Sequence, residues 1–186
     1  MTLLVLGLLL WTVSHTLKRL APGLRAALGE GAGKGIVSLL SLAGIILMVL
    51  GYRAAPVVPV YAPLPGMGHL NNLLMLFALF FFIAGNLKPG RVAARVRHNM
   101  LTGVLIWAVA HLLVNGDLAS IVLFGGMALY ALLSMALISR AEPWARPEPG
   151  PLRNDLVAAL AALVLYAGIA GVHIWLGHNP FLGTYG

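Results

Sequence analysis

The stretch that decides the fold runs from Arg97 to Asp117 and reads RHNMLTGVLIWAVAHLLVNGD. It begins with charge, continues as an apolar helix, and carries His98 at its start and His111 deep in its apolar part. Along a helix these two imidazoles are separated by about 20 Å and about 140°, so they cannot bind one small centre. An ionisable side chain in an apolar helix is costly, so His111 is expected to face a partner inside a bundle. It shares one helical stripe with Met100, Val104 and Trp107.

Composition indicates an integral membrane protein. The chain has 186 residues, of which 60% are hydrophobic and only 9% are charged, and its mean hydropathy is +0.94. Cysteine is absent, which excludes disulfides, thiolate metal sites and cysteine nucleophiles. The net charge of +7 comes from short loops between apolar segments, so it indicates membrane topology and contact with the lipid bilayer, and no nucleic-acid partner.

The apolar segments predict an all-α fold, a bundle of six membrane-spanning helices in one domain covering residues 1–186. The first span is expected to be retained, because no cleavage site for a signal peptide follows it. No convincing internal repeat is found. The expected spans are Thr2–Leu20, about Gly35–Tyr52, Leu70–Leu87, Asn99–Val114, Leu118–Ser139, and a last one that Asn154 or Asp155 caps and that ends near Leu176.

Lysine and arginine are distributed unevenly between the loops. Of the twelve basic residues, only Arg53 lies on the side opposite to the rest. The positive-inside rule therefore predicts that both termini face away from the cytoplasm, which in a bacterial inner membrane means the periplasm. The eleven residues on the cytoplasmic side are Lys18, Arg19, Arg25, Lys34, Lys88, Arg91, Arg95, Arg97, Arg140, Arg146 and Arg153.

Two of the six histidines lie inside predicted membrane spans, where a polar side chain is costly and a purely structural role explains it poorly. His15 lies in the apolar part of the first span, between Trp11 and the basic pair Lys18-Arg19, and His111 lies in the fourth. A bond to a backbone carbonyl or an interfacial position explains His15 about as well as metal ligation does. The remaining four, His69, His98, His173 and His178, are expected near the membrane surfaces, where an unliganded imidazole costs little.

Two apolar imidazoles without a deep carboxylate or thiolate suit a haem better than zinc, because haem asks the protein for only one or two ligands. Without an attachment motif for c-type haem, any haem is expected to be non-covalent. The candidates to pair with its propionates are Arg19, Arg25, Arg95 and Arg97. His15 and His111 differ in expected height by 10 Å or more, so a haem between them needs either a ligand axis strongly inclined to the membrane plane or helices displaced vertically. His173 is the fallback partner for His111.

Several motifs resemble those of the NnrU family of bacterial membrane proteins, which is similar to the 15-cis-zeta-carotene isomerase of plants and cyanobacteria. The motifs are the histidine ending the first span, Gly29-Glu30, Ser38 to Gly44, Gly51-Tyr52-Arg53, and Arg97-His98 through Trp107, Ala110-His111-Leu112 and Asn115-Gly116. The resemblance implies a haem b held by His15 and His111, and either redox-dependent double-bond isomerisation of a hydrophobic or isoprenoid substrate or a link to nitrite and nitric oxide metabolism. Asn99 stands in place of the family's proline, and Ala108 in place of the isomerase's cysteine.

Two other functions remain open from the sequence. Arg97-His98 before a helix of small residues also resembles the cofactor motif of S-adenosylmethionine-dependent membrane methyltransferases of the isoprenylcysteine or phospholipid type. Those enzymes add an acidic residue after the next span, and Glu142 is the candidate here. A third hypothesis, beside the haem protein and the methyltransferase, is an assembly partner without a cofactor. The sequence fixes neither the oligomeric state nor whether the protein is an enzyme.

Overall fold

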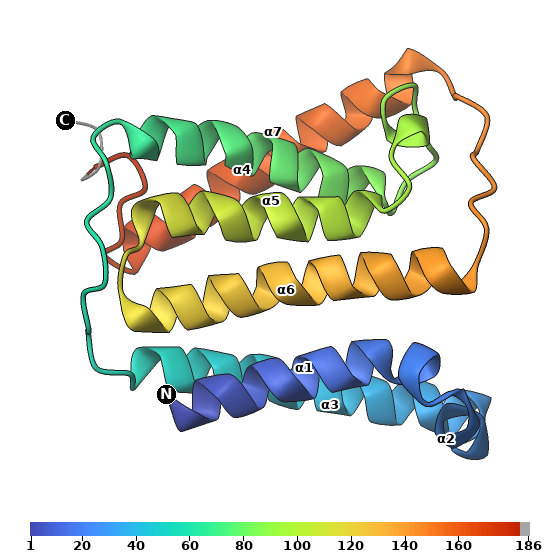
Figure 1. Cartoon of the computed structure of the whole chain (residues 1–186). Coiled ribbons are helices and arrows are strands. Elements are labelled where there is room, and N and C mark those ends of the chain that lie inside the picture. Colours follow the sequence, from blue (N-terminus) through green and yellow to red (C-terminus); the bar gives the residue numbers. More distant parts are fainter. Residues whose placement is uncertain (183–186) are drawn as a thin grey trace. The chain divides into compact units, whose positions relative to one another are not determined.

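The computed structural model describes residues 1–182, and in them the regular structure is entirely helical (Figure 1). Five helices are long and apolar enough to cross a membrane. The chain is thus an all-helical, multi-pass membrane protein. The helices are α1 (Thr2–Leu20), α2 (Pro22–Ala27), α3 (Glu30–Arg53), α4 (Met67–Ala84), the 3-10 turn η1 (Ala93–Arg95), α5 (Asn99–Val114), α6 (Leu118–Ala141) and α7 (Leu152–Trp175).

Most of the predicted spans match these helices, but α3 begins at Glu30 and not near Gly35, and α4 spans Met67–Ala84 where Leu70–Leu87 was expected. The expected loop after the first span contains α2, which begins with Pro22 at a position where proline favours a helix start. The third span begins earlier than predicted because Gly66, in the left-handed conformation, sets the start of α4. The fourth predicted span is confirmed as the helix α5, but its 16 residues are short for a bilayer. Whether α5 crosses the membrane, in addition to the five longer helices, stays a prediction.

The helices form two compact units. Unit 1 comprises Met1–Val60 and Asp117–Pro143, and unit 2 comprises Tyr61–Gly116 and the chain from Trp144 onward. Whether the chain is one domain stays a prediction. In unit 1, α1 packs against α3 and α6. A Cβ added to Gly7 would lie 2.6 Å from the Met48 nitrogen and 2.7 Å from the Gly44 oxygen, so only glycine permits this approach of α1 to α3.

In unit 2, α4 packs against both α5 and α7 (Figure 1). Gly103 allows the close contact with α5, because an added Cβ would lie 2.6 Å from the Ala78 oxygen and 2.8 Å from the Phe82 nitrogen. Small residues thus set the helix spacing in both units, as expected where lipid offers no hydrophobic drive for helix association. A buried cluster of Ala84, Ala93 and Ala158 joins α4, η1 and α7.

Asp155 stabilises the conformation of the basic loop between α4 and α5 by accepting hydrogen bonds from it. Its carboxylate is 5% exposed and accepts backbone N–H groups from Arg91 at 2.6 Å, Val92 at 3.1 Å and Ala93 at 3.4 Å. The predicted cap role of Asn154 or Asp155 is wrong, since α7 begins after Pro151 without a side-chain cap. The carboxylate fills a concave run of N–H groups in the loop, an arrangement that binds anions.

Candidate functional site

His15 lies near the C-terminal end of α1 in unit 1. Its Nδ1 lies 2.9 Å from the Trp11 carbonyl oxygen, which can only accept a hydrogen bond, so Nδ1 is the protonated nitrogen. The Trp11 ring stacks on the imidazole at 4.0 Å between centroids, and the Tyr130 ring of α6 meets its edge at 5.6 Å. These contacts leave Nε2 as the nitrogen with a lone pair.

His111 lies half-buried in the last turns of α5 in unit 2 and repeats this arrangement. Its Nδ1 donates to the Trp107 carbonyl oxygen at 2.9 Å, and the Trp107 ring lies 5.2 Å from the imidazole. A histidine held through Nδ1 by a backbone carbonyl has the tautomer and the fixed orientation that metal-ligating histidines have. Both candidate ligands are therefore prepared for coordination through Nε2.

His173, on α7, has the same geometry as the first two histidines. Its Nδ1 donates to the Ile169 carbonyl oxygen at 2.8 Å, and its ring is half-buried. It belongs to the same unit as His111 and lies close enough for the charge on one ring to act on the other. The structure thus brings His111 together with the fallback residue His173, and it describes His15 separately in unit 1.

His15 and His111 have similar surroundings because α1 and α5 share a short sequence repeat, which was not predicted. Each histidine follows a glycine by eight positions, which turns the imidazole about 80° away from the face that packs closely against the neighbouring helix. The repeat was missed because it covers only one helix of each unit. It pairs Gly7, Leu9, Trp11, Val13, His15 and Leu17 with Gly103, Leu105, Trp107, Val109, His111 and Leu113 at a constant offset.

The four arginines expected to pair with cofactor carboxylates are divided between the units, with Arg19 and Arg25 in unit 1 and Arg95 and Arg97 in unit 2. Arg19, with a side chain 24% exposed, forms an ion pair with Glu142 at 2.7 Å between Nη1 and Oε1. Glu142, the candidate acid of a methyltransferase, therefore has a partner in unit 1. Arg97 precedes α5, and about 20 Å of helix separates it from His111. Its neighbour in the sequence is His98, whose pKa is lowered by burial and by the Arg97 charge.

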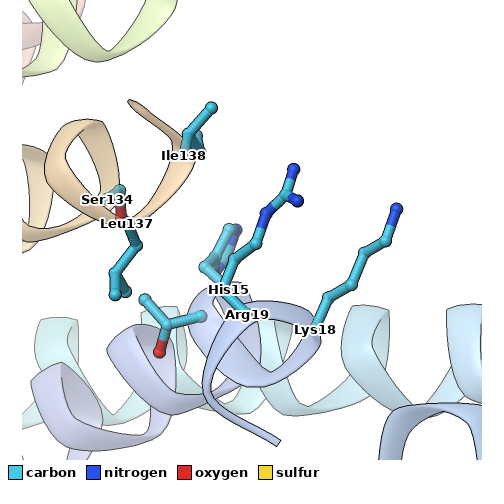
Figure 2. A pocket seen from close by; sticks show the side chains of 7 residues that line it. His15, Lys18, Arg19, Ser134, Leu137 and Ile138 are labelled. Atoms are coloured by element: carbon cyan, nitrogen blue, oxygen red, sulfur yellow. The ribbon is translucent and has the colours of Figure 1, made fainter. Parts of the chain in front are cut away.

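A pocket of about 180 Å³ opens beside His15 in unit 1 (Figure 2). One wall consists of cationic and polar side chains of α1, and the other of side chains near the end of α6. The Ser134 hydroxyl is buried there and lies in reach of Tyr130, but it forms no hydrogen bond. The pocket is lined by His15, Thr16, Lys18, Arg19, Ser134, Leu137 and Ile138.

The remaining histidines are placed at helix ends or beyond them. His69 is exposed in the first turn of α4, and His178 is exposed after α7. His98 precedes α5, but its side chain does not cap the helix. Within residues 1–182 no three histidine or carboxylate side chains are grouped so that they could hold a metal ion. What the arrangement offers is single Nε2 ligands, each held in place by its own helix.

Comparison with protein families gives one match. The model of the family described as NnrU protein matches residues 3–180, and therefore covers both units and all three histidines held by backbone carbonyls. Comparison with curated proteins and with solved structures gives no match.

Proposed function

The chain belongs to the NnrU protein family, and from this premise we propose that it is a haem b-binding membrane protein with bis-histidine ligation inside its helices. The observation that carries the proposal is the bond from His111 Nδ1 to the Trp107 carbonyl oxygen at 2.9 Å, which fixes the tautomer and orientation that iron-ligating histidines have. Haem needs only one or two protein ligands, and isolated imidazoles in apolar helices provide them.

Histidines of each unit have the chemistry of haem ligands, since each ring is held through Nδ1 by a backbone carbonyl. His111 is the proposed first ligand, with His15 as the proposed second ligand and His173 as the alternative in the same unit. The backbone carbonyl that accepts from Nδ1 keeps each ring from rotating and increases the basicity of Nε2. Trp107 lies beside the ring of His111 and restricts its movement. Arg19 and Arg97 are the proposed partners of the two carboxylates.

When bound, the haem would supply an iron that exchanges single electrons, which is chemistry that no side chain of this chain provides. The apolar side chains around the histidines would keep water away and favour a hydrophobic substrate. We place this function in nitrite and nitric oxide metabolism, or in isomerase-like chemistry on an isoprenoid double bond. Family membership supports this placement, and the choice between the two is open to experiment.

The proposed location is a bacterial inner membrane with both termini in the periplasm. The support is the distribution of basic residues, since eleven of the twelve fall in alternate loops. Unit 1 fits this distribution, because Lys18 and Arg19 end α1 and Arg140 lies near the end of α6.

Absorption and resonance Raman spectra of the purified full chain test the proposal. We expect a Soret band typical of six-coordinate low-spin haem in the unchanged protein and its loss in His111→Ala. The second ligand is identified by comparing His15→Ala with His173→Ala, because the variant that removes it converts the spectrum to the five-coordinate high-spin form while haem is retained.

His178→Ala is the matched control, since that ring is exposed beyond the last helix, and its spectrum should stay unchanged. The proposal fails if the chain, supplied with haem during expression, is colourless, or if haem is retained unchanged in all three in-span histidine variants.

A further inference from the structure

The pocket beside His15 shares His15 and Arg19 with the proposed haem site, but it also has a second cation, a buried hydroxyl and an apolar wall that the haem proposal does not use. Two cationic side chains, Lys18 and Arg19, lie on one side of it, and the apolar side chains of Leu137 and Ile138 on the other (Figure 2). α1 and α6 are both apolar enough to cross a membrane, and Lys18 and Arg19 lie in the last turn of α1. The pocket is therefore expected at the boundary between the hydrocarbon and the lipid headgroups. We propose that the pocket binds the phosphate group of an anionic membrane amphiphile, whose chain lies along α6.

The Ser134 hydroxyl provides the first argument. The residue is only 7% exposed, and its Oγ lies near the Tyr130 hydroxyl but has no hydrogen-bond partner of good geometry among the described residues. A buried hydroxyl without a partner is costly, and native structures contain few. Ser134 lines the pocket, so a phosphate oxygen there would accept a hydrogen bond from it.

The charges supply the second argument. No carboxylate of residues 1–182 forms an ion pair with Lys18, and the pair of Arg19 with Glu142 is partly open to solvent, with 54% of the Glu142 side chain exposed. Such exposed pairs are weak, and a guanidinium has five N–H donors, so Arg19 can bind a phosphate with or without its present partner. The ammonium and the guanidinium would face the doubly bonded and charged oxygens of one phosphate group.

The size of the pocket is the third argument. Its volume of about 180 Å³ is several times the ~30 Å³ that a water molecule occupies in the liquid, so a phosphate group and the first atoms of a chain fit. A free phosphate would use the charges but not the contacts with Leu137 and Ile138. The apolar wall therefore favours an amphiphile over an inorganic ion.

Lipid titrations of the detergent-purified full chain, followed by native mass spectrometry, test this proposal. Phosphatidylglycerol should bind about tenfold more tightly than phosphatidylcholine with the same acyl chains, a difference of about 1.4 kcal/mol. Lys18→Gln combined with Arg19→Gln should abolish the preference. Arg140→Gln is the matched control, because it removes a charge from the same end of α6 without touching the pocket.

Ser134→Ala provides a second variant that is expected to fold, since its Oγ has only a poorly aligned contact with Tyr130 to lose. It should weaken phosphatidylglycerol binding by about tenfold or more, as expected for one hydrogen bond to a charged group. Equal affinity for the two lipids, or a preference unchanged in the Lys18/Arg19 double variant, overturns the proposal.

Two further arms distinguish the source of the anion. If millimolar inorganic phosphate displaces phosphatidylglycerol, the site binds free phosphate and the assignment to an amphiphile is wrong. Haem content is read from the Soret band of the same samples, so the two proposals fail separately. A double variant that loses haem but keeps the lipid preference would assign these cations to cofactor carboxylates and overturn the lipid site.

Discussion

Asp155 acts on the loop between α4 and α5, and not on its own helix. It stands in the first turn of α7, where a carboxylate commonly pairs with the N–H groups of that helix. Its oxygens instead accept from three consecutive N–H groups of the loop. Asn154 adds a bond from its side-chain amide to the Pro89 oxygen at 3.1 Å. One turn of α7 therefore holds the conformation of a loop distant in the sequence.

Asp155→Asn should lower the stability of the protein markedly. The amide keeps one acceptor but loses the charge that strengthens the bonds, which should cost about 2 kcal/mol. For a chain of this length that corresponds to a decrease in Tm of about 4–8 °C, measured by tryptophan fluorescence in detergent. Glu148→Gln, in an exposed loop, should leave the Tm unchanged. Equal melting of the two variants would contradict the role of Asp155.

Asp117 makes stability depend on pH at the start of α6. Burial acts to raise the pKa of Asp117, but hydrogen bonds from the Ser120 hydroxyl at 2.5 Å and the Ser120 N–H at 3.0 Å outweigh it and lower the pKa. A carboxyl with a lowered folded pKa stabilises the folded protein above its unfolded value, about 3.9. This stabilisation is lost as the pH falls through the folded pKa.

We therefore expect the Tm to fall below about pH 4 in the unchanged protein, and Asp117→Asn to reduce this dependence. Asparagine is as good an N-cap as aspartate, so the variant removes the charge and keeps the start of the helix. Melting curves between pH 3 and pH 6 provide the measurement. Parallel pH profiles for the two proteins would show that another carboxyl is responsible.

At the scale of helices, α1 and α5 each depend on one glycine to pack against a neighbouring helix, α3 and α4 respectively. Gly7→Ala and Gly103→Ala each place a methyl group within 3 Å of backbone atoms of the neighbouring helix. Such overpacking typically costs 1–3 kcal/mol, so each variant should melt several degrees lower. Gly125→Ala in α6 is the control, because nothing lies within 4 Å of its added Cβ and alanine favours a helix. A stable Gly7→Ala variant would refute the close contact of α1 and α3.

The helices could largely be predicted from the sequence, because long apolar segments leave the backbone no other way to satisfy its hydrogen bonds in lipid. Asn99–Val114 was predicted to the residue, since a basic loop and Asn115-Gly116 bound it. The short helix α2 was missed, because six residues with glycine and arginine give no clear hydrophobic period. The i−4 pairing of His111 with Trp107 follows from helix geometry, whereas the ion pair of Arg19 with Glu142 is a tertiary contact that no local pattern indicates.

For the molecule as a whole, the orientation in the membrane can be tested directly, because the chain contains no cysteine. A single cysteine introduced at Ala62 should react with a membrane-impermeant maleimide in intact spheroplasts. One introduced at Ala145, in the loop between α6 and α7, should react only after lysis. Both positions are exposed in the structure, so local burial does not interfere. The reverse pattern would place the basic loops outside the cell and overturn the proposed topology.

The carboxylate of Asp155 also bears on how the basic loop behaves in solutions of different ionic strength. A concave run of N–H groups that binds a dissolved anion is occupied only to the extent that the anion concentration in the buffer allows. Here the counter-ion is part of the polypeptide, so its effective concentration is set by α7 and dilution cannot remove it. The loop can therefore keep one shape while the exposed charges of Lys88, Arg91 and Arg95 remain available to lipid phosphates.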